Sequence, residues 1–181
     1  MDARSKKLRT QNDYPFHLEY RTRWYVFSGL DDNQKTDGFR SDNDMYGHMN
    51  NSVYAFLFDS IINSYLISHC GLNPTNTKPA TKGDGERHGQ IGLVVSSYCD
   101  YFASVGFPDT LNLGLRAVKL GSSSVTYEVG VFKQGEEKVK VVGGFTHVFV
   151  HRETMRPRAG GMDTQIRQGL EKLFTGDAPK L

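Results

Sequence analysis

Residues 51–69 carry the only long helix pattern in the sequence. Asn50 or Asn51 can cap its start, because a short side-chain oxygen accepts a hydrogen bond from an N–H that the helix leaves unpaired. Gly71 and then Pro74 follow its end, as is typical after a helix. Large apolar residues cover most of its circumference: Val53, Tyr54, Phe56, Leu57, Phe58, Ile61, Ile62, Tyr65 and Leu66. A helix that is apolar on so many sides must be largely enclosed by other elements.

Other segments show the apolar and polar alternation of strands. One of them, residues 16–27, precedes the helix. The others follow it with no second long helix among them: 91–103, 110–120, 122–134 and 138–151. Gly121 and Gly135 begin sequences that suit hairpin turns, and Gly143-Gly144 inside the last segment predicts a bulge or a bend.

The order of these elements predicts an α+β domain. Helix and strands are segregated along the chain, which argues against a doubly wound sheet. A single helix wrapped by a strongly curved antiparallel sheet would explain why the helix is apolar all round. Residues 163–174 predict a short terminal helix. We therefore expect one domain over residues 15–175, with a flexible tail at 1–14 and another tail at 176–181.

Composition and charge exclude several classes of partner. The chain has 181 residues, of which 38% are hydrophobic, so a full core needs no metal or disulfide. Its 22 basic and 20 acidic residues leave a net charge of +2, which gives no reason to expect a nucleic-acid partner. No apolar run reaches the length of about 18 residues that a membrane span needs.

The cysteines and the two ends of the chain bear on the compartment. Cys70 and Cys99 cannot make a disulfide framework, which favours a reduced, intracellular compartment, with the cytoplasm as the first expectation. The basic N-terminal residues leave a mitochondrial transit peptide open. The terminal Pro-Lys-Leu resembles the peroxisomal Ser-Lys-Leu signal only loosely, so a peroxisomal location is also open.

The stretch from Asp42 to Asn51 concentrates two carboxylates, an imidazole, a glycine and two amides just ahead of the helix. One interpretation is a capped turn, since Asp and Asn favour turns and Gly47 permits a positive φ. The other is a catalytic site, because the start of a helix offers unpaired N–H groups and positive potential to a developing oxyanion. A carboxylate one turn ahead could then act as a base or a nucleophile.

The run D-x-D-x-x-G-H-x-N-N-x-x-Y, from Asp42 to Tyr54, resembles the hot-dog-fold thioesterases related to 4-hydroxybenzoyl-CoA thioesterase. Weaker matches follow in the expected order: Tyr101, Pro108-Asp109, Leu111, Gly121-Ser122-Ser123-Ser124 and Thr154-x-Arg156-Pro157. The resemblance covers roughly residues 16–157. It implies the hot-dog fold, in which a curved antiparallel sheet wraps one long central helix.

The resemblance also assigns the two catalytic positions. Asp44, the second acid of the D-x-D run, matches the family's catalytic aspartate. Asn51 matches the position whose backbone N–H polarises the thioester carbonyl. This agrees with the helix pattern, because an amide so early in a helix has no partner within it.

Other residues around the motif are candidates for substrate binding. Gly47 and His48 would shape the turn, Asn50 lies beside the oxyanion donor, and Tyr54 would form a pocket wall. Asp59, about two turns along the helix from Asn51, matches a position that carries the catalytic carboxylate in other branches of the superfamily. Asp59 could equally be a structural acid, and Asp44 takes precedence over it.

Ser123 and Ser124 complete the candidate set. The resemblance places their turn near the coenzyme A arm, across a dimer interface. No metal site is expected, because His147 and His151 share a strand face but lie about 13 Å apart. The sequence also has no G-x-S-x-G elbow for a Ser-His-Asp triad. No cofactor is expected, since coenzyme A is part of the substrate.

The predicted activity is hydrolysis of a fatty or aryl acyl-CoA thioester to a free acid and coenzyme A, as part of lipid metabolism. The resemblance implies a homodimer with a continuous sheet, or a homotetramer formed as a dimer of dimers. Two alternatives stay open: a non-catalytic hot-dog module for acyl binding or assembly, and a thioesterase that acts on acyl carrier protein.

One segment departs from the family pattern. Arg21-Thr22-Arg23-Trp24 should run directly into Ser41-Asp42, but residues 25–40 lie between them. The ends of this segment allow splice signals to be written in frame, so we hypothesise a retained intron. A real loop insertion is the alternative, because the entropy cost of closing a loop grows slowly with its length. Sequencing the mature transcript decides between them.

Overall fold

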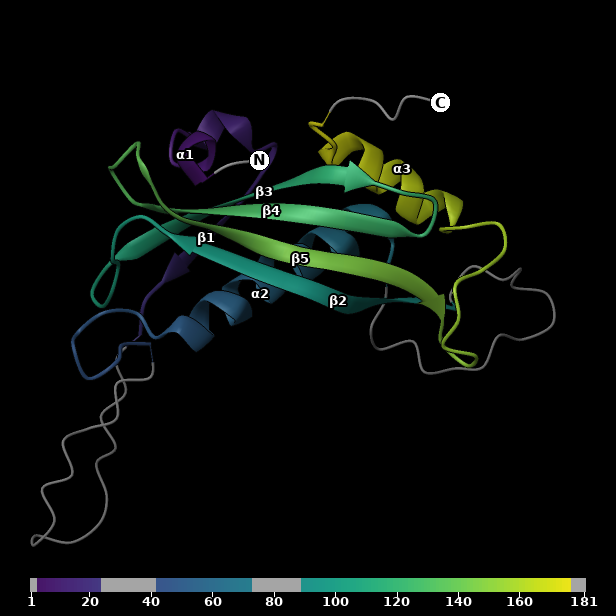
Figure 1. The fold of residues 1–181 in the computed structure, drawn as a ribbon, viewed down its shortest axis with the longest axis horizontal. Coiled ribbons are helices and arrows are strands. Elements are labelled where there is room, and N and C mark those ends of the chain that lie inside the picture. The colour runs from purple at the N-terminus through teal and green to yellow at the C-terminus, as the bar shows by residue number, and fades with distance from the viewer. Residues whose placement is uncertain (1–2, 24–41, 73–88, 177–181) are drawn as a thin grey trace, which may run out of the picture.

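The computed structural model describes residues 3–23, 42–72 and 89–176. Its elements are α1 (Ala3–Lys6), η1 (Gln11–Asp13), β1 (Phe16–Arg21), α2 (Asn51–Cys70), β2 (Gln90–Tyr101), β3 (Thr110–Leu120), β4 (Ser124–Lys133), β5 (Val139–His151) and α3 (Thr164–Leu173). The strands form one antiparallel sheet in the order β1-β3-β4-β5-β2. Figure 1 shows α2 lying along one face of this curved sheet, as the sequence predicts.

The ends of α2 follow from the residues that flank it. Asn50 is the N-cap, and its Oδ1 accepts a hydrogen bond from the Ser52 N–H at 3.0 Å. Gly71 adopts a left-handed φ of 68° and donates its N–H to the Leu66 carbonyl, which ends the helix. The predicted helix over 51–69 is therefore confirmed, one residue longer at its end.

Two glycines of β5 allow close packing around the core. A Cβ on Gly143 would lie 2.4 Å from Cε2 of Phe58, so only a glycine lets this helix side chain reach the sheet. A Cβ on Gly144 would lie 2.2 Å from the Tyr127 carbonyl oxygen. Of the bulge or bend predicted here, the bulge is wrong, because the pairing of β4 with β5 keeps one register on both sides of the two glycines. The register shifts between β5 and its neighbours lie at Val94/Ser96 and at Val131/Phe132.

The N-terminal residues 3–14, for which the sequence predicts a flexible tail, contact the sheet face opposite α2. The Lys6 ammonium lies 2.6 Å from the Asp100 carboxylate, and Arg9 Nε lies 3.0 Å from Glu128 Oε1. Tyr14 is buried with Phe132, Val139 and Val142. The polar sequence of this segment gave no sign of these contacts. Charged side chains and one aromatic ring make them, and no apolar stripe is present.

The strands predicted after the long helix and the short terminal helix agree in position with the structure. α3 packs against the end of α2, where the Tyr65 hydroxyl donates to the Gly169 carbonyl at 2.7 Å. β1 ends at Arg21, earlier than the predicted strand over 16–27. Residues 25–40 and 177–181 lie outside the described residues. Within the described ranges, no helix is long and apolar enough to cross a membrane.

Candidate active site

The acidic motif folds into a tight turn that leads directly into α2. Asn43 and Met49 form an antiparallel bridge across it. The Asp44 N–H donates to the His48 carbonyl at 2.6 Å, and the Gly47 N–H donates to the Asp44 carbonyl at 3.2 Å. Gly47 has a φ of 82°, which favours a residue without a side chain. The turn geometry thus requires the glycine that the sequence singled out.

The Asp44 carboxylate is half-buried, and backbone donors fix its orientation. Its Oδ1 accepts hydrogen bonds from the Tyr46 N–H at 2.8 Å and from the His48 N–H at 3.0 Å. Its Oδ2 accepts none from the described part of the chain, so this oxygen is available to a water molecule or a substrate. Oδ1 therefore caps the turn, as one interpretation of the sequence predicts, and Oδ2 remains available for a catalytic role, as the other requires.

The start of α2 presents its unpaired amides next to this turn. The Asn50 N–H donates to the Asp42 carbonyl at 2.8 Å, which ties the acidic turn to the first residue before the helix. The N–H of Asn51, at the first helical position, has no acceptor among residues 3–23, 42–72 and 89–176. Such an amide carries part of the positive end of the helix dipole and suits an oxyanion.

Two residues that the sequence analysis did not assign hold the turn in place. Asp42 is buried, and its Oδ2 accepts hydrogen bonds from the Tyr20 hydroxyl at 3.0 Å and from the Arg23 N–H. Asn43 donates from Nδ2 to the Gly47 carbonyl and accepts at Oδ1 from the Phe107 N–H, at 3.0 and 2.9 Å. The D-x-D spacing was the available signal for Asp42, whose role is positioning.

Tyr54 and Tyr101 form an aromatic wall beside the first turn of α2. Tyr54 is buried, and its ring packs edge-on against Tyr101 with centroids 5.3 Å apart. Burial raises the pKa of Tyr54, and the charge of Asp44 is one of the smaller causes that raise it further. The Tyr54 hydroxyl therefore stays protonated.

The structure does not bring every candidate residue to the turn. The side chains of His48, Asn50 and Asn51 are exposed there. Asp59 is also exposed, about 12 Å further along the axis of α2 than Asn51. Ser123 and Ser124 follow β3, whose first residue Thr110 pairs with Arg21 near the acidic turn. They lie at the far end of this strand, so one chain alone does not place them beside Asp44.

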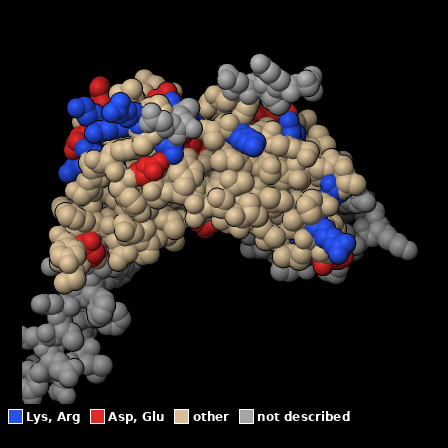
Figure 2. Space-filling view, viewed as in Figure 1, with Lys and Arg blue, Asp and Glu red and all other residues tan. Residues whose placement is uncertain are grey.

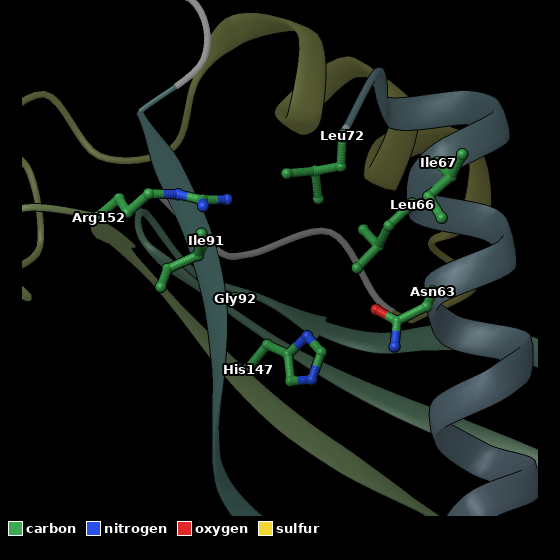
Figure 3. Close-up of a pocket in the computed structure, with 8 residues that line it drawn as sticks. All are labelled: Asn63, Leu66, Ile67, Leu72, Ile91, Gly92, His147 and Arg152. Carbon is green, nitrogen blue, oxygen red and sulfur yellow. The ribbon is translucent and has the colours of Figure 1, made fainter. Parts of the chain in front are cut away.

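A cavity of about 320 Å³ opens between the second half of α2 and the sheet. It is lined by Asn63, Leu66, Ile67, Leu72, Ile91, Gly92, His147 and Arg152 (Figure 3). His147 was considered only as a metal ligand in the sequence. The signal missed was its position between Phe145 and Phe149, which places it on the sheet face toward α2.

Charge is spread unevenly on the surface. Figure 2 shows basic and acidic side chains mixed over the N-terminal segment, while most of the viewed face of the sheet carries neither. Within the residues that the structure describes, no three His, Cys, Asp or Glu side chains are grouped so that they could hold a metal ion.

Comparison with known proteins identifies the family. Residues 46–140, just over half of the chain, match the model of the thioesterase superfamily. The solved structure of the PA5185 protein from Pseudomonas aeruginosa PAO1 is 36% identical, with a TM-score of 0.73 over 91% of this chain and 95% of that one. None of the curated proteins matches the chain.

More distant solved structures share the fold. A thioesterase from Thermus thermophilus, complexed with coenzyme A and Zn, is 20% identical, with a TM-score of 0.58 over 87% of this chain and 98% of that one. The DHNA-CoA thioesterase from Staphylococcus aureus is 18% identical, with a TM-score of 0.56 over 78% of each chain. The family model covers just over half of the chain, and a solved structure of 36% identity matches nearly its whole length. The curved sheet around α2 agrees with both. The chain therefore belongs to the thioesterase superfamily of the hot-dog fold.

Proposed function

We propose that the chain hydrolyses acyl-CoA thioesters at the acidic turn, with Asp44 and the Asn51 N–H as its catalytic groups. The observation that carries this proposal is the Asp44 carboxylate: two backbone donors hold Oδ1, while Oδ2 is left available at the start of α2. Pre-oriented groups at the open end of a helix suit a reaction in which negative charge develops on a carbonyl oxygen.

In one route Asp44 is the general base. Oδ2 takes a proton from water as the water oxygen bonds to the thioester carbon, and the carbonyl electron pair moves onto its oxygen, which accepts a hydrogen bond from the Asn51 N–H. Collapse of this intermediate re-forms the C=O bond and breaks the C–S bond. The proton on Asp44 then passes to the coenzyme A sulfur.

In the other route Asp44 is the nucleophile. Its carboxylate attacks the thioester carbon and expels the coenzyme A thiolate, leaving an anhydride between Asp44 and the acyl group. Water then hydrolyses the anhydride to the free acid and restores the carboxylate. In both routes Asp42 and Asn43 position the turn. Tyr54 and Tyr101 line the side of the site that receives the acyl group.

Coenzyme A is the proposed carrier of the acyl group. Support comes from relatives: the Thermus thermophilus thioesterase was solved with coenzyme A, and the Staphylococcus aureus enzyme is a DHNA-CoA thioesterase. Acyl carrier protein is the alternative carrier, and a non-catalytic acyl-binding module is the alternative function.

We further propose that the working unit is a homodimer joined through β2, which can associate further into a tetramer. β2 is an edge strand of the described sheet and exposes Val94 and Val95 at 50% and 59%. An exposed apolar edge is a site for pairing with a second copy. Val95→Lys should give monomers in sedimentation analysis, whereas His17→Lys on the opposite edge strand should keep the dimer. Equal masses for both variants would contradict this interface.

Thiol release from a panel of thioesters tests the function. Acyl-CoA and acyl carrier protein thioesters carrying the same chains would be compared at equal concentration. Faster release from acyl-CoA is expected. Faster release from acyl carrier protein would show that this protein, and not coenzyme A, carries the acyl group of the substrate. Binding of acyl-CoA without thiol release would contradict the hydrolase and favour the acyl-binding module.

A further inference from the structure

The cavity between α2 and the sheet lies apart from the acidic turn. Asn63 on its α2 side is about 18 Å further along the helix axis than Asn51. β2 runs back along α2, with Tyr101 beside Tyr54 at one end and Ile91 at the cavity. An acyl group must therefore be about 18 Å long to extend from a thioester at Asp44 to the cavity, which a single aromatic ring is not.

His147 is the buried polar group of the cavity. Its side chain is 3% exposed, and neither ring nitrogen has a hydrogen-bond partner within the described residues. Burial lowers the pKa of His147 to about 4, and the opposing effect of the Asp59 charge is smaller, so the ring is neutral at pH 7. A buried polar group without a partner costs free energy, which a ligand in the cavity would recover.

Gly92 on β2 lies directly against this imidazole. A Cβ at Gly92 would lie 2.9 Å from Nδ1 of His147 and 3.4 Å from the ring of Phe149. Real side chains essentially never show such a short Cβ contact, so any larger residue would push the imidazole from its place. The glycine therefore lets β2 pack directly against a histidine that has no hydrogen-bond partner among the described residues.

Arg152 supplies a charge at the same cavity. Figure 3 shows its guanidinium and the His147 imidazole pointing into one space, with Asn63 on the α2 side. No carboxylate forms an ion pair with Arg152 in the part of the chain that the structure describes. The other walls are the apolar side chains of Leu66, Ile67, Leu72 and Ile91.

The cavity thus combines apolar walls with a cation, an imidazole and an amide. We propose that it binds the distal carboxylate of a dicarboxylic acyl chain whose thioester lies at Asp44. Arg152 pairs with the carboxylate, while the His147 N–H and the Asn63 amide donate hydrogen bonds to it. Asp59 lies one turn nearer the helix start than Asn63, so its charge directs the carboxylate toward the Arg152 end. This substrate class rests on the proposed thioesterase function.

Binding of free decanoate tests the cavity without any thioester. Calorimetry should show decanoate bound by the wild type and by Arg21→Gln, which removes an exposed charge at the opposite sheet edge. Arg152→Gln should weaken binding about tenfold or more, and decanol should bind more weakly than decanoate. The NMR signals of the His147 ring should shift on decanoate addition. Unaltered affinity in Arg152→Gln, or equal affinity for decanol, would overturn the proposal.

Turnover then tests whether the carboxylate belongs to the substrate. Hexadecanedioyl-CoA should have a KM about tenfold or more below that of hexadecanoyl-CoA, and Arg152→Gln should remove the difference. Equal KM values in the wild type would overturn the assignment to a substrate, even where decanoate binds. Arg152-dependent decanoate binding without hydrolysis of any thioester would support the cavity chemistry and contradict the proposed function alone.

Discussion

A buried carboxylate on one face of the sheet and a buried histidine on the other differ in the partners they have. On the face away from α2, Glu128 is 2% exposed and has three partners: Arg9 at 3.0 Å, Arg116 at 2.7 Å and the Tyr14 hydroxyl at 3.2 Å. On the face toward α2, His147 is as deeply buried and its ring nitrogens have no partner among the described residues. The first arrangement holds the fold together, whereas the second leaves hydrogen-bonding capacity for a ligand.

Disrupting the interactions of Glu128 should cause the largest loss of stability. Glu128→Ala leaves Arg116 buried without its carboxylate and releases Arg9 from the N-terminal segment. We expect the free energy of unfolding in urea to fall by about 3–5 kcal/mol. Glu137→Ala, at an exposed position in the β4–β5 turn, should leave it unchanged. Equal stability of the two variants would show that the Glu128 cluster is not structural.

The buried, unpaired His147 should make the free energy of unfolding depend on pH. The pKa of His147 is about 4 when folded and near 6.5 when unfolded, so the unfolded chain binds more protons between these values. Stability therefore falls as the pH is lowered from 6.5 to 4, by roughly 3 kcal/mol in total from this group. His147→Phe should lack that part of the fall in urea unfolding, while His17→Gln at an exposed site should retain it. The same pH dependence in all three proteins would contradict a buried neutral histidine.

The absence of a side chain at Gly92, beside His147, should matter more for binding than for stability. Gly92→Ala places a methyl group where the imidazole lies, and such overpacking should cost about 1 kcal/mol in urea unfolding. Decanoate affinity should fall with it, since the methyl group displaces the imidazole that lines the cavity. Gly135→Ala, in an open turn with positive φ, should show a comparable stability loss with unchanged affinity. Unchanged affinity in Gly92→Ala would show that the cavity is not the binding site.

The smallest effect is expected where the N-terminal segment meets solvent. Lys6 pairs with Asp100, whose side chain is 37% exposed. Lys6→Ala should lower the free energy of unfolding by less than about 1 kcal/mol, and high salt should reduce the difference. A larger, salt-independent loss would mean that the Lys6 pair contributes as much to this face as the Glu128 cluster.

Local signals made much of the fold predictable. Asn50 and Gly71 bound α2 through their own side-chain and backbone preferences, and the alternation of Leu111, Leu113 and Leu115 marks β3 because successive side chains point to opposite faces. The turn at Gly47 was likewise visible, since its neighbours and its positive φ are local properties.

Contacts between distant residues were not predictable. Arg9 and Glu128 are 119 positions apart, so nothing in the first residues showed that they would pack on the sheet. Asn43 reaches Phe107 across 64 positions to hold the acidic turn. The alternation of β5 shows which face His147 occupies, but its lack of a partner among the described residues depends on α2 and on Gly92, which only the folded chain brings together.

The most direct test of the proposed function is a single-turnover assay of Asp44→Asn. The amide keeps the shape of the turn but neither accepts a proton nor attacks the thioester. We expect thiol release from bound acyl-CoA to slow by about 10²–10⁴-fold, with unfolding in urea little changed. Asp163→Asn at the start of α3 should release thiol at the wild-type rate. Thiol release by Asp44→Asn at the wild-type rate would contradict catalysis by the Asp44 carboxylate.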